Sequence, residues 1–215
     1  MNTAERTAAV ARKHKRGAVA LLAAAEELYG RHGLDGVTIR QITLAAGMAN
    51  NSAVAYHFGN KDGLLRAISE WRLPVIEAAA VSQLAHVRAI GAEHSIDAII
   101  GVLLRPFLAI RDARGRHPHA RFMQQMLRSS EGRAIRLAML SASPATAAAF
   151  DLLQSCLPHL SRELLHYRMR IGSVAFFDGI SEWDRAESSI EFPVFTLDEV
   201  ANELIGMVAA NCQRP

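Results

Sequence analysis

The sequence is poor in the features that mark disulfide-rich, zinc-binding and membrane proteins. Its 215 residues include only two cysteines, Cys156 and Cys212, and these exclude a disulfide framework and a four-cysteine zinc site. The longest wholly apolar run is about eight residues, 18–25, whereas a bilayer span needs roughly 20. The first 17 residues are basic and polar and lack a signal-peptide pattern. A cytoplasmic protein that avoids membranes is therefore expected.

Signatures of the common enzyme classes are also missing. The chain has no nucleophile elbow, no phosphate-binding glycine–lysine loop, no zinc-protease helix and no dinucleotide fingerprint. The pair His117 and His119 hints at a metal, but no cluster of cysteines or carboxylates accompanies it. We therefore expect no catalysis, no cofactor and no metal. Two alternatives stay open: an all-helical small-molecule enzyme or carrier, and a helical architectural DNA-binding protein without an effector.

What the sequence does contain is helical patterning and an uneven charge. Half of the residues are hydrophobic, only 6% are aromatic, and no alternating strand of useful length occurs, so an all-α fold is predicted. Residues 1–72 carry 10 Lys/Arg and 6 Asp/Glu, whereas residues 73–215 carry 14 and 15. A small basic head on a near-neutral body suggests that the head meets a polyanion.

The head is predicted to hold three helices. A flexible basic arm, 1–15, precedes a helix over about 16–32, which Gly33 caps. Thr38 and Gln41 have the spacing of a capping box at the start of a short helix over about 39–46. Gly47 then breaks the chain before another short helix, which begins near Asn50 or Asn51 and ends near His57, and Asn60 caps the next helix. Two short helices around a glycine turn are typical of a helix-turn-helix unit.

Residues 16–66, about a quarter of the chain, resemble the DNA-binding head of TetR/AcrR transcriptional regulators. The matching segments are 28–33, 37–42, 45–47 and 52–65. Two departures are clear: the stretch 47–58 is one residue longer than the commonest family form, and Ala55 stands where many members have Tyr or His. The resemblance implies double-stranded DNA as partner. The expected DNA contacts are Thr38, Arg40, Gln41, Asn50, Asn51, Ser52, Ala53, Tyr56, His57 and Lys61.

Elementary chemistry supports these contacts. Thr38 at a helix N-terminus offers a hydroxyl and free N–H groups to a phosphate. Asn51 carries the amide that suits adenine, and Ser52 suits base or phosphate. The resemblance places His57 and Lys61 where the family grips phosphate.

The resemblance implies that the rest of the chain, 73–215, forms a larger helical domain for effector binding and dimerisation, with 16–72 as the DNA-binding domain. Its predicted helices are 74–89, 95–114, 118–128, 131–141, 145–156, 159–187 and 197–212, and 187–196 is expected to be an ordered loop. The candidates for an effector pocket are Phe107, Arg111, Phe122, Met123, Met126, Tyr167 and Phe177.

The last two predicted helices are apolar on more than one face, and one of them has a strip of small residues. A two-fold, four-helix dimer interface is expected there, the alternative being one thicker monomeric core. The interface candidates are Met169, Gly172, Phe176, Gly179, Trp183, Leu204 and Val208. The overall prediction is a homodimeric repressor that binds a palindromic operator. The resemblance further implies that an unknown small molecule releases the repressor from DNA by moving helix 61–72 like a lever.

Overall fold

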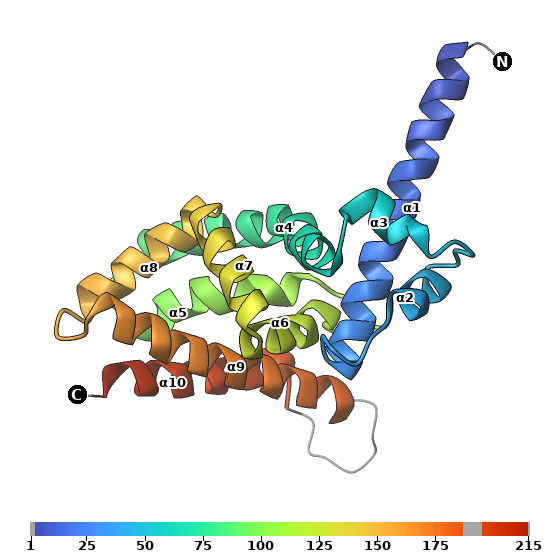
Figure 1. Cartoon of the computed structure of the whole chain (residues 1–215). Helices are drawn as coiled ribbons and strands as arrows, with labels where there is room; N and C mark the ends of the chain where they lie inside the picture. The colour runs from blue at the N-terminus through green and yellow to red at the C-terminus, as the bar shows by residue number, and fades with distance from the viewer. Residues whose placement is uncertain (1–2, 187–194, 215) are drawn as a thin grey trace.

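The computed structural model describes residues 3–186 and 195–214, with side chains for 16–139, 142–186 and 195–214. All elements in these ranges are helical (Figure 1), as the sequence predicts. The helices are α1 (Thr3–His32), α2 (Ile39–Ala45), α3 (Ser52–Phe58), α4 (Lys61–Ala89), α5 (Ile96–Leu104), the 3-10 helix η1 (Arg105–Ala109), α6 (Pro118–Arg128), α7 (Ser130–Ser141), α8 (Pro144–Cys156), α9 (Arg162–Ala186) and α10 (Leu197–Gln213).

The head consists of α1, α2, α3 and the first turns of α4. Apolar residues at helical spacing on α1, including Tyr29, are buried against Ile42 of α2, Val54 of α3 and Leu64 of α4. Each of the short helices therefore buries one apolar anchor and leaves its opposite face outward. In Figure 1 the head lies at one end of the molecule, and the C-terminus lies at the other.

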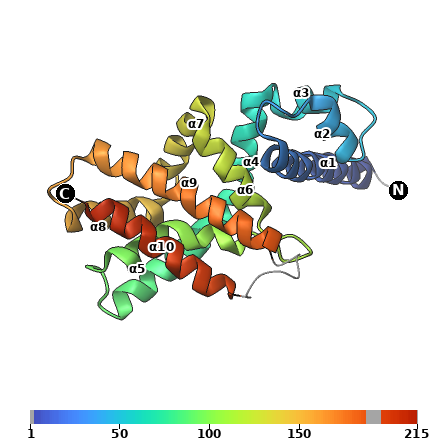
Figure 2. The same ribbon diagram turned by 90° about the horizontal axis from the view of Figure 1, so that it is seen from below.

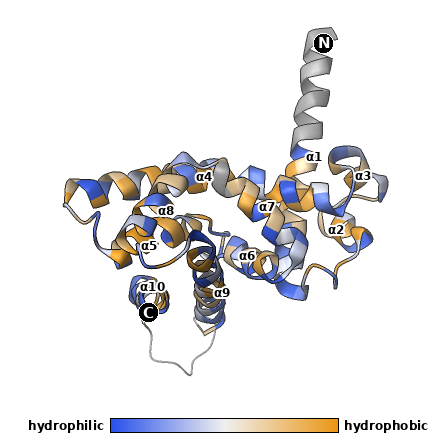
Figure 3. Cartoon of the chain, turned by 60° about the vertical axis from the view of Figure 1, so that its left-hand side comes forward, coloured by the Kyte–Doolittle hydropathy of each residue, from blue (hydrophilic) through white to orange (hydrophobic). Residues whose placement is uncertain are grey.

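The body consists of the remaining helices, and α6 joins it to the head. Gly30 of α1 lies so close to α6 that an added Cβ would be 3.1 Å from Cβ of Arg121 and 3.2 Å from the backbone nitrogen of Phe122. At the outer edge α9 and α10 run side by side (Figure 2). Figure 3 shows hydrophobic and hydrophilic residues along both of these helices.

Several predicted helix boundaries are wrong. The first helix begins at Thr3, so residues 3–15 are helical instead of a flexible arm. The predicted helices 61–72 and 74–89 are one helix, because Pro74 is accommodated inside α4, although proline removes one backbone hydrogen bond. Position 72–73, predicted as a domain boundary, thus falls within a continuous helix.

Two more ends differ. The helix predicted for 95–114 ends at Leu104 and continues only as the 3-10 turn η1, with Pro106 near its start. The helix predicted from 159 begins at Arg162. Residues 187–194 of the predicted ordered loop lie outside the described part. Among the described helices, none combines the length and the apolar character that a membrane crossing requires.

Candidate DNA-binding surface and effector cavity

The entry to α2 is fixed by the predicted capping box. Oγ1 of Thr38 accepts from the backbone N–H of Gln41 at 3.3 Å, and Oε1 of Gln41 accepts from the backbone N–H of Thr38 at 2.8 Å. Gly47 then takes a positive φ of 70°, which lets the chain turn sharply between α2 and α3. Both Thr38 and Gln41 are exposed. They therefore cap the helix and still face solvent at its N-terminus.

Asn50 and Asn51 are engaged within the turn. Oδ1 of Asn50 accepts from the backbone N–H of Ser52 at 2.9 Å and from the Ser52 hydroxyl at 2.8 Å. Oδ1 of Asn51 accepts from the hydroxyl of buried Thr43 at 2.9 Å. A bidentate contact with adenine uses both the oxygen and the nitrogen of the amide. The side-chain oxygens of Asn50 and Asn51 therefore organise the turn between α2 and α3.

The outward face of α3 consists of Ser52, Ala55 and Tyr56, all exposed. Tyr56 has 71% of its surface exposed, so it does not pack between helices as an interior aromatic would. Val54, on the other side of the helix, is buried in the head core. Ala53 is half-buried. A seven-residue helix anchored on one side and open on the other has the form of a recognition helix.

The rim of this face carries basic side chains. Arg40 on α2 is exposed, and His57 at the end of α3 is half-buried, with the Tyr56 ring 5.0 Å away. Lys61 begins α4, where Oδ1 of Asn60 caps the helix by accepting from the N–H of Gly63 at 2.8 Å. Nζ of Lys61 lies 2.7 Å from Oδ1 of the fully exposed Asp35.

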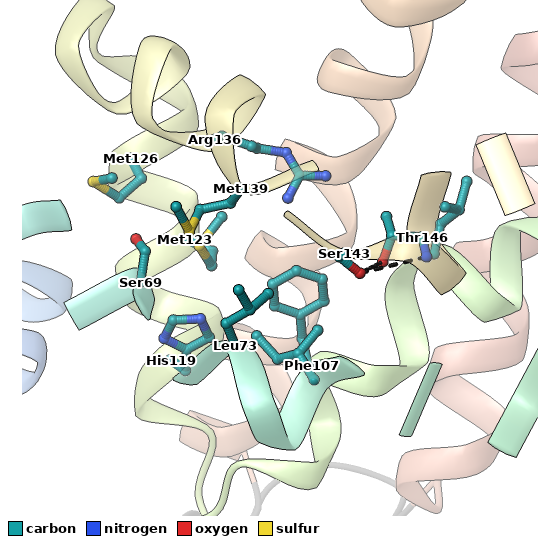
Figure 4. A pocket seen from close by; sticks show the side chains of 12 residues that line it. Ser69, Leu73, Phe107, His119, Met123, Met126, Arg136, Met139, Ser143 and Thr146 are labelled. Carbon is teal, nitrogen blue, oxygen red and sulfur yellow. Dashed lines mark hydrogen bonds between the residues drawn. The ribbon is translucent and has the colours of Figure 1, made fainter. Parts of the chain in front are cut away.

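A cavity of about 50 Å³ lies in the body among α4, α5, α6, α7 and α8. Its wall is mostly apolar and includes Phe107, Met123 and Met126, three of the predicted pocket residues (Figure 4). Arg136 and His119 lie on either side of it in Figure 4. This volume accommodates a few water molecules, so a larger ligand requires the flexible methionines to rearrange.

The cavity wall connects directly to the head. The Arg136 guanidinium lies 5.8 Å from the Phe107 ring, and that ring is stacked on His119 at 5.8 Å and 6°. Nδ1–H of His119 donates to Oε1 of Glu26 on α1 at 2.7 Å. Arg72 of α4 donates to both oxygens of the same carboxylate, at 3.0 and 2.5 Å.

Glu26 is 1% exposed. Burial alone would raise its pKa, but the hydrogen bonds and charges of His119 and Arg72 together hold the pKa below its ordinary value of 4.5. An ionised carboxylate at this point ties together α1, α4 and α6. His119, which lines this cavity, thus connects the cavity wall to a buried charge network in the head.

A second cavity, of about 320 Å³, lies between α7 and α9. Tyr167, predicted as a pocket residue, lines it, and Arg136 and Leu103 belong to both cavities. The other predicted pocket residues line neither cavity. Arg111 is exposed and donates to its neighbour Leu108, whereas Phe122 and Phe177 are fully buried in the core.

Most of the predicted dimer residues make packing contacts within their own chain, and their part in a dimer interface stays a prediction. A Cβ added to Gly172 would lie 2.6 Å from Val208, and one added to Gly179 would lie 2.7 Å from Leu204. The strip of small residues therefore permits the close approach of α9 and α10 in the same protomer. Met169, Phe176 and Val208 are buried, and Trp183 donates to the carbonyl of Phe195 at 2.9 Å.

Comparison with known families identifies both parts of the chain. The family model described as bacterial regulatory proteins of the tetR family matches residues 21–68. A second model, described as the tetracyclin repressor-like C-terminal domain, matches residues 101–211, more than half of the chain. The chain belongs to the TetR family. It is a transcriptional regulator with a helix-turn-helix head and a family-type C-terminal domain.

Solved structures share the fold of this TetR-family regulator at low identity. A TetR-family regulator from Marinobacter aquaeolei matches with a TM-score of 0.60 and 17% identity, over 93% of this chain and 97% of the other. The regulator FadR from Bacillus subtilis, in complex with stearoyl-CoA, matches with a TM-score of 0.56 and 14% identity, over 90% and 98%. PfmR from Thermus thermophilus matches with a TM-score of 0.52 and 17% identity, over 91% and 96%. No curated protein matches the chain.

Sequence reasoning about this TetR-family regulator missed Glu26, His119 and Arg136 as parts of one network. The two charged residues had a local signal. Glu26 falls one turn after Leu22 on the apolar stripe of α1, and Arg136 falls one turn after Arg133 within an otherwise apolar segment. A charged residue on the apolar face of a helix predicts that a buried partner or a ligand lies next to it. The sequence spacing does not say which residue or ligand that partner is.

The two histidines considered as a metal site serve different carboxylates. Nδ1 of His117 lies 2.8 Å from Oδ1 of Asp184 on α9, whereas His119 contacts Glu26 on α1. Among the described residues no group of three or more metal-ligating side chains converges. The two contacts instead tie α6 to α9 and α1.

Proposed function

We propose that this TetR-family regulator is a repressor that binds a palindromic operator as a homodimer and leaves it when a small molecule enters the body. The outward face of α3 carries the proposal, because Val54 anchors that helix while Ser52 and Tyr56 stay open to a groove. A short helix presented in this way fits the major groove of DNA.

The contacts divide into positioning and reading groups. Thr38 and Gln41 at the N-terminus of α2, with Arg40, His57 and Lys61 around the rim, are placed to meet phosphates. Ser52, Ala53 and Tyr56 enter the groove, where the methyl of neighbouring Ala55 suits the methyl of thymine. Asn50 and Asn51 hold the turn through their oxygens and offer their amide nitrogens to the DNA.

The dimer contact is proposed on the outer face of α9 and α10. Ile171 on α9 and Met207 on α10 are 43% and 57% exposed, and Leu164 and Tyr167 extend the same side of α9. Large apolar side chains gathered on paired helices favour burial against a second copy. Two heads on such a dimer can read two half-sites about one helical turn apart.

Release is proposed to pass through the charge network between cavity and head. A ligand that displaces Phe107 or His119 changes the hydrogen bonds of Glu26, to which α1 and α4 are attached. A coupling of about 1–3 kcal/mol is enough for roughly 5- to 150-fold weaker DNA binding. FadR, which shares the fold, was solved with stearoyl-CoA, and this supports an effector role for the body.

Selection of bound duplexes from random DNA tests the proposal. We expect a two-fold symmetric site occupied by two chains, with the stoichiometry measured by sedimentation. Arg40→Ala should weaken binding to that site severalfold, whereas Arg88→Ala, an exposed arginine at the far end of α4, should leave it unchanged. Binding to duplexes with no preference over heparin would refute sequence-specific repression. Specific binding that no small molecule reverses would favour the architectural alternative.

A further inference from the structure

The cavity between α7 and α9 is the strongest unassigned feature of the body. Its volume of about 320 Å³ is at the lower end of small-molecule sites, which span roughly 300–1,000 Å³. The inner wall is apolar and comes from four different helices. The buried residues of that wall are Leu103, Leu127, Phe150 and Met169.

Cationic and imidazole side chains face each other across this cavity. Arg133 and Arg136 lie one turn apart on α7, and His166 and Arg170 lie one turn apart on α9. No carboxylate lines the cavity. The nearest acid on α9 in sequence, Glu163, is exposed and lies outside the wall. The cavity therefore has a positive potential with no resident counter-charge among its lining residues.

These arginines differ from others in the body. Arg105, Arg116 and Arg162 each have a carboxylate partner, at 3.2, 2.6 and 3.0 Å. Within the described part of the chain, neither Arg136 nor Arg170 forms an ion pair, and their recorded contacts are with the aromatic rings of Phe107 and Tyr167.

Among the cationic groups of the cavity, Arg136 has the charged form that burial disfavours most. Burial lowers the pKa of its guanidinium to about 10, because removing a cation from water without a partner disfavours the charged form. An anion in the cavity would restore the missing charge pairing. A hydrocarbon group on the same molecule would also cover the apolar wall, which water hydrates poorly.

We propose that the cavity between α7 and α9 binds an organic carboxylate, with Arg136 as the group that holds the carboxylate and the apolar wall as the seat of the hydrocarbon chain. This specifies the chemical class of the effector and rests on the proposed function for its regulatory role. Arg136 also borders the inner cavity beside Phe107. A carboxylate that draws Arg136 away from Phe107 therefore acts on the aromatic pair that contacts Glu26 through His119.

The test compares three ligands with the same chain: decanoate, decanol and decylamine. Calorimetry on the full-length protein without DNA should find decanoate bound about 10- to 100-fold more tightly than decanol, with decylamine weakest. Arg136→Met should lower decanoate affinity to that of decanol, and Arg136→Lys should retain part of the preference. The matched control is Arg185→Met. Arg185 is an exposed arginine near the C-terminal end of α9, away from His166 and Arg170 of the cavity, so this variant should bind decanoate as the parent does.

Equal binding of decanoate and decanol, preference for the amine, or no binding of any of the three would overturn the proposal. So would an unchanged preference in Arg136→Met. If that variant does not fold, the comparison of ligands on the parent protein and Arg136→Lys still decides. Addition of decanoate to the operator complex is a separate measurement. Binding without release would leave the site standing and refute only ligand-controlled repression.

Discussion

The cationic side chains on the surface of the head and those in the interior of the molecule have different surroundings. On the head, Arg40 is exposed and Lys61 meets Asp35, a carboxylate that is itself fully exposed. Deeper in the molecule, Arg72 grips the buried carboxylate of Glu26, and Arg136 lies between two cavities without a carboxylate partner among the described residues. The cations of the head therefore face water, whereas Arg72 and Arg136 are largely shielded from it.

The difference corresponds to two kinds of anion. Exposed cations interact weakly and are screened by salt, so binding to a polyanion such as DNA depends on many contacts and falls as the salt concentration rises. A buried cation interacts strongly with a single counter-charge, because little water screens it. The same residue types can therefore serve an extended partner on the head and one small anion or carboxylate inside.

The largest effect is expected from breaking the buried pair at the junction. Glu26→Gln removes the negative charge that His119 and Arg72 share and leaves the half-buried guanidinium of Arg72 without its counter-ion. The free energy of unfolding at pH 7, measured by urea denaturation, should fall by about 3 kcal/mol. Glu27→Gln is the matched control. Its half-buried carboxylate forms an i,i+4 pair with Arg31, so the loss should be about 0.5 kcal/mol or less.

The difference in the free energy of unfolding between the parent and Glu26→Gln should depend on pH in one direction. Because the pKa of Glu26 is lowered in the folded protein, its stabilisation is fully present above about pH 4.5 and is lost as the pH falls through the folded-state pKa. The difference in the free energy of unfolding between parent and variant should therefore become smaller below pH 4.5. A gap that stayed constant down to about pH 3 would show that Glu26 is not held ionised by this network.

The helix ends and turns of the head could be predicted from the sequence, because each of them is formed by residues that are close together in the chain. The Thr38–Gln41 capping box, the turn at Gly47 and the Asn60 cap are formed by residues within four positions of each other. Such features depend on short-range hydrogen bonds and on the backbone freedom of glycine. They are largely independent of how the rest of the chain folds.

The body depends on contacts that no local rule supplies. Glu26 lies 46 residues from Arg72 and 93 from His119, so only the tertiary fold brings them together. The spacing of Gly172 and Gly179 correctly indicates a close helix contact, but it does not say whether the partner is α10 of the same chain or a second protomer. Pro74 similarly suggests a break, but the helix continues through it, and Trp71 and Ile76 on either side pack in the core.

An intermediate effect is expected where α1 and α6 meet. Gly30→Ala should lower the free energy of unfolding by about 1 kcal/mol, because crowding against the backbone of Phe122 outweighs the gain in helix propensity. Gly17→Ala on the same helix is the control. Among the described side chains its Cβ would meet the end of Met48, which can move, so stability should rise by up to about 1 kcal/mol. Equal stability of the two variants would mean that α1 and α6 separate without cost.

The smallest effect is expected at the surface. Lys61→Ala should weaken binding to all DNA sequences alike and reduce the slope of log affinity against log salt by about 1, measured by fluorescence anisotropy. Asp35→Asn breaks the same exposed ion pair but keeps the lysine, so it should leave affinity equal or slightly higher. If both variants weakened binding equally, Lys61 would act by holding the start of α4 to the loop after α1. Lys61 would then stabilise the protein through its carboxylate partner, as Arg72 does in the interior, and would not serve mainly as a DNA contact.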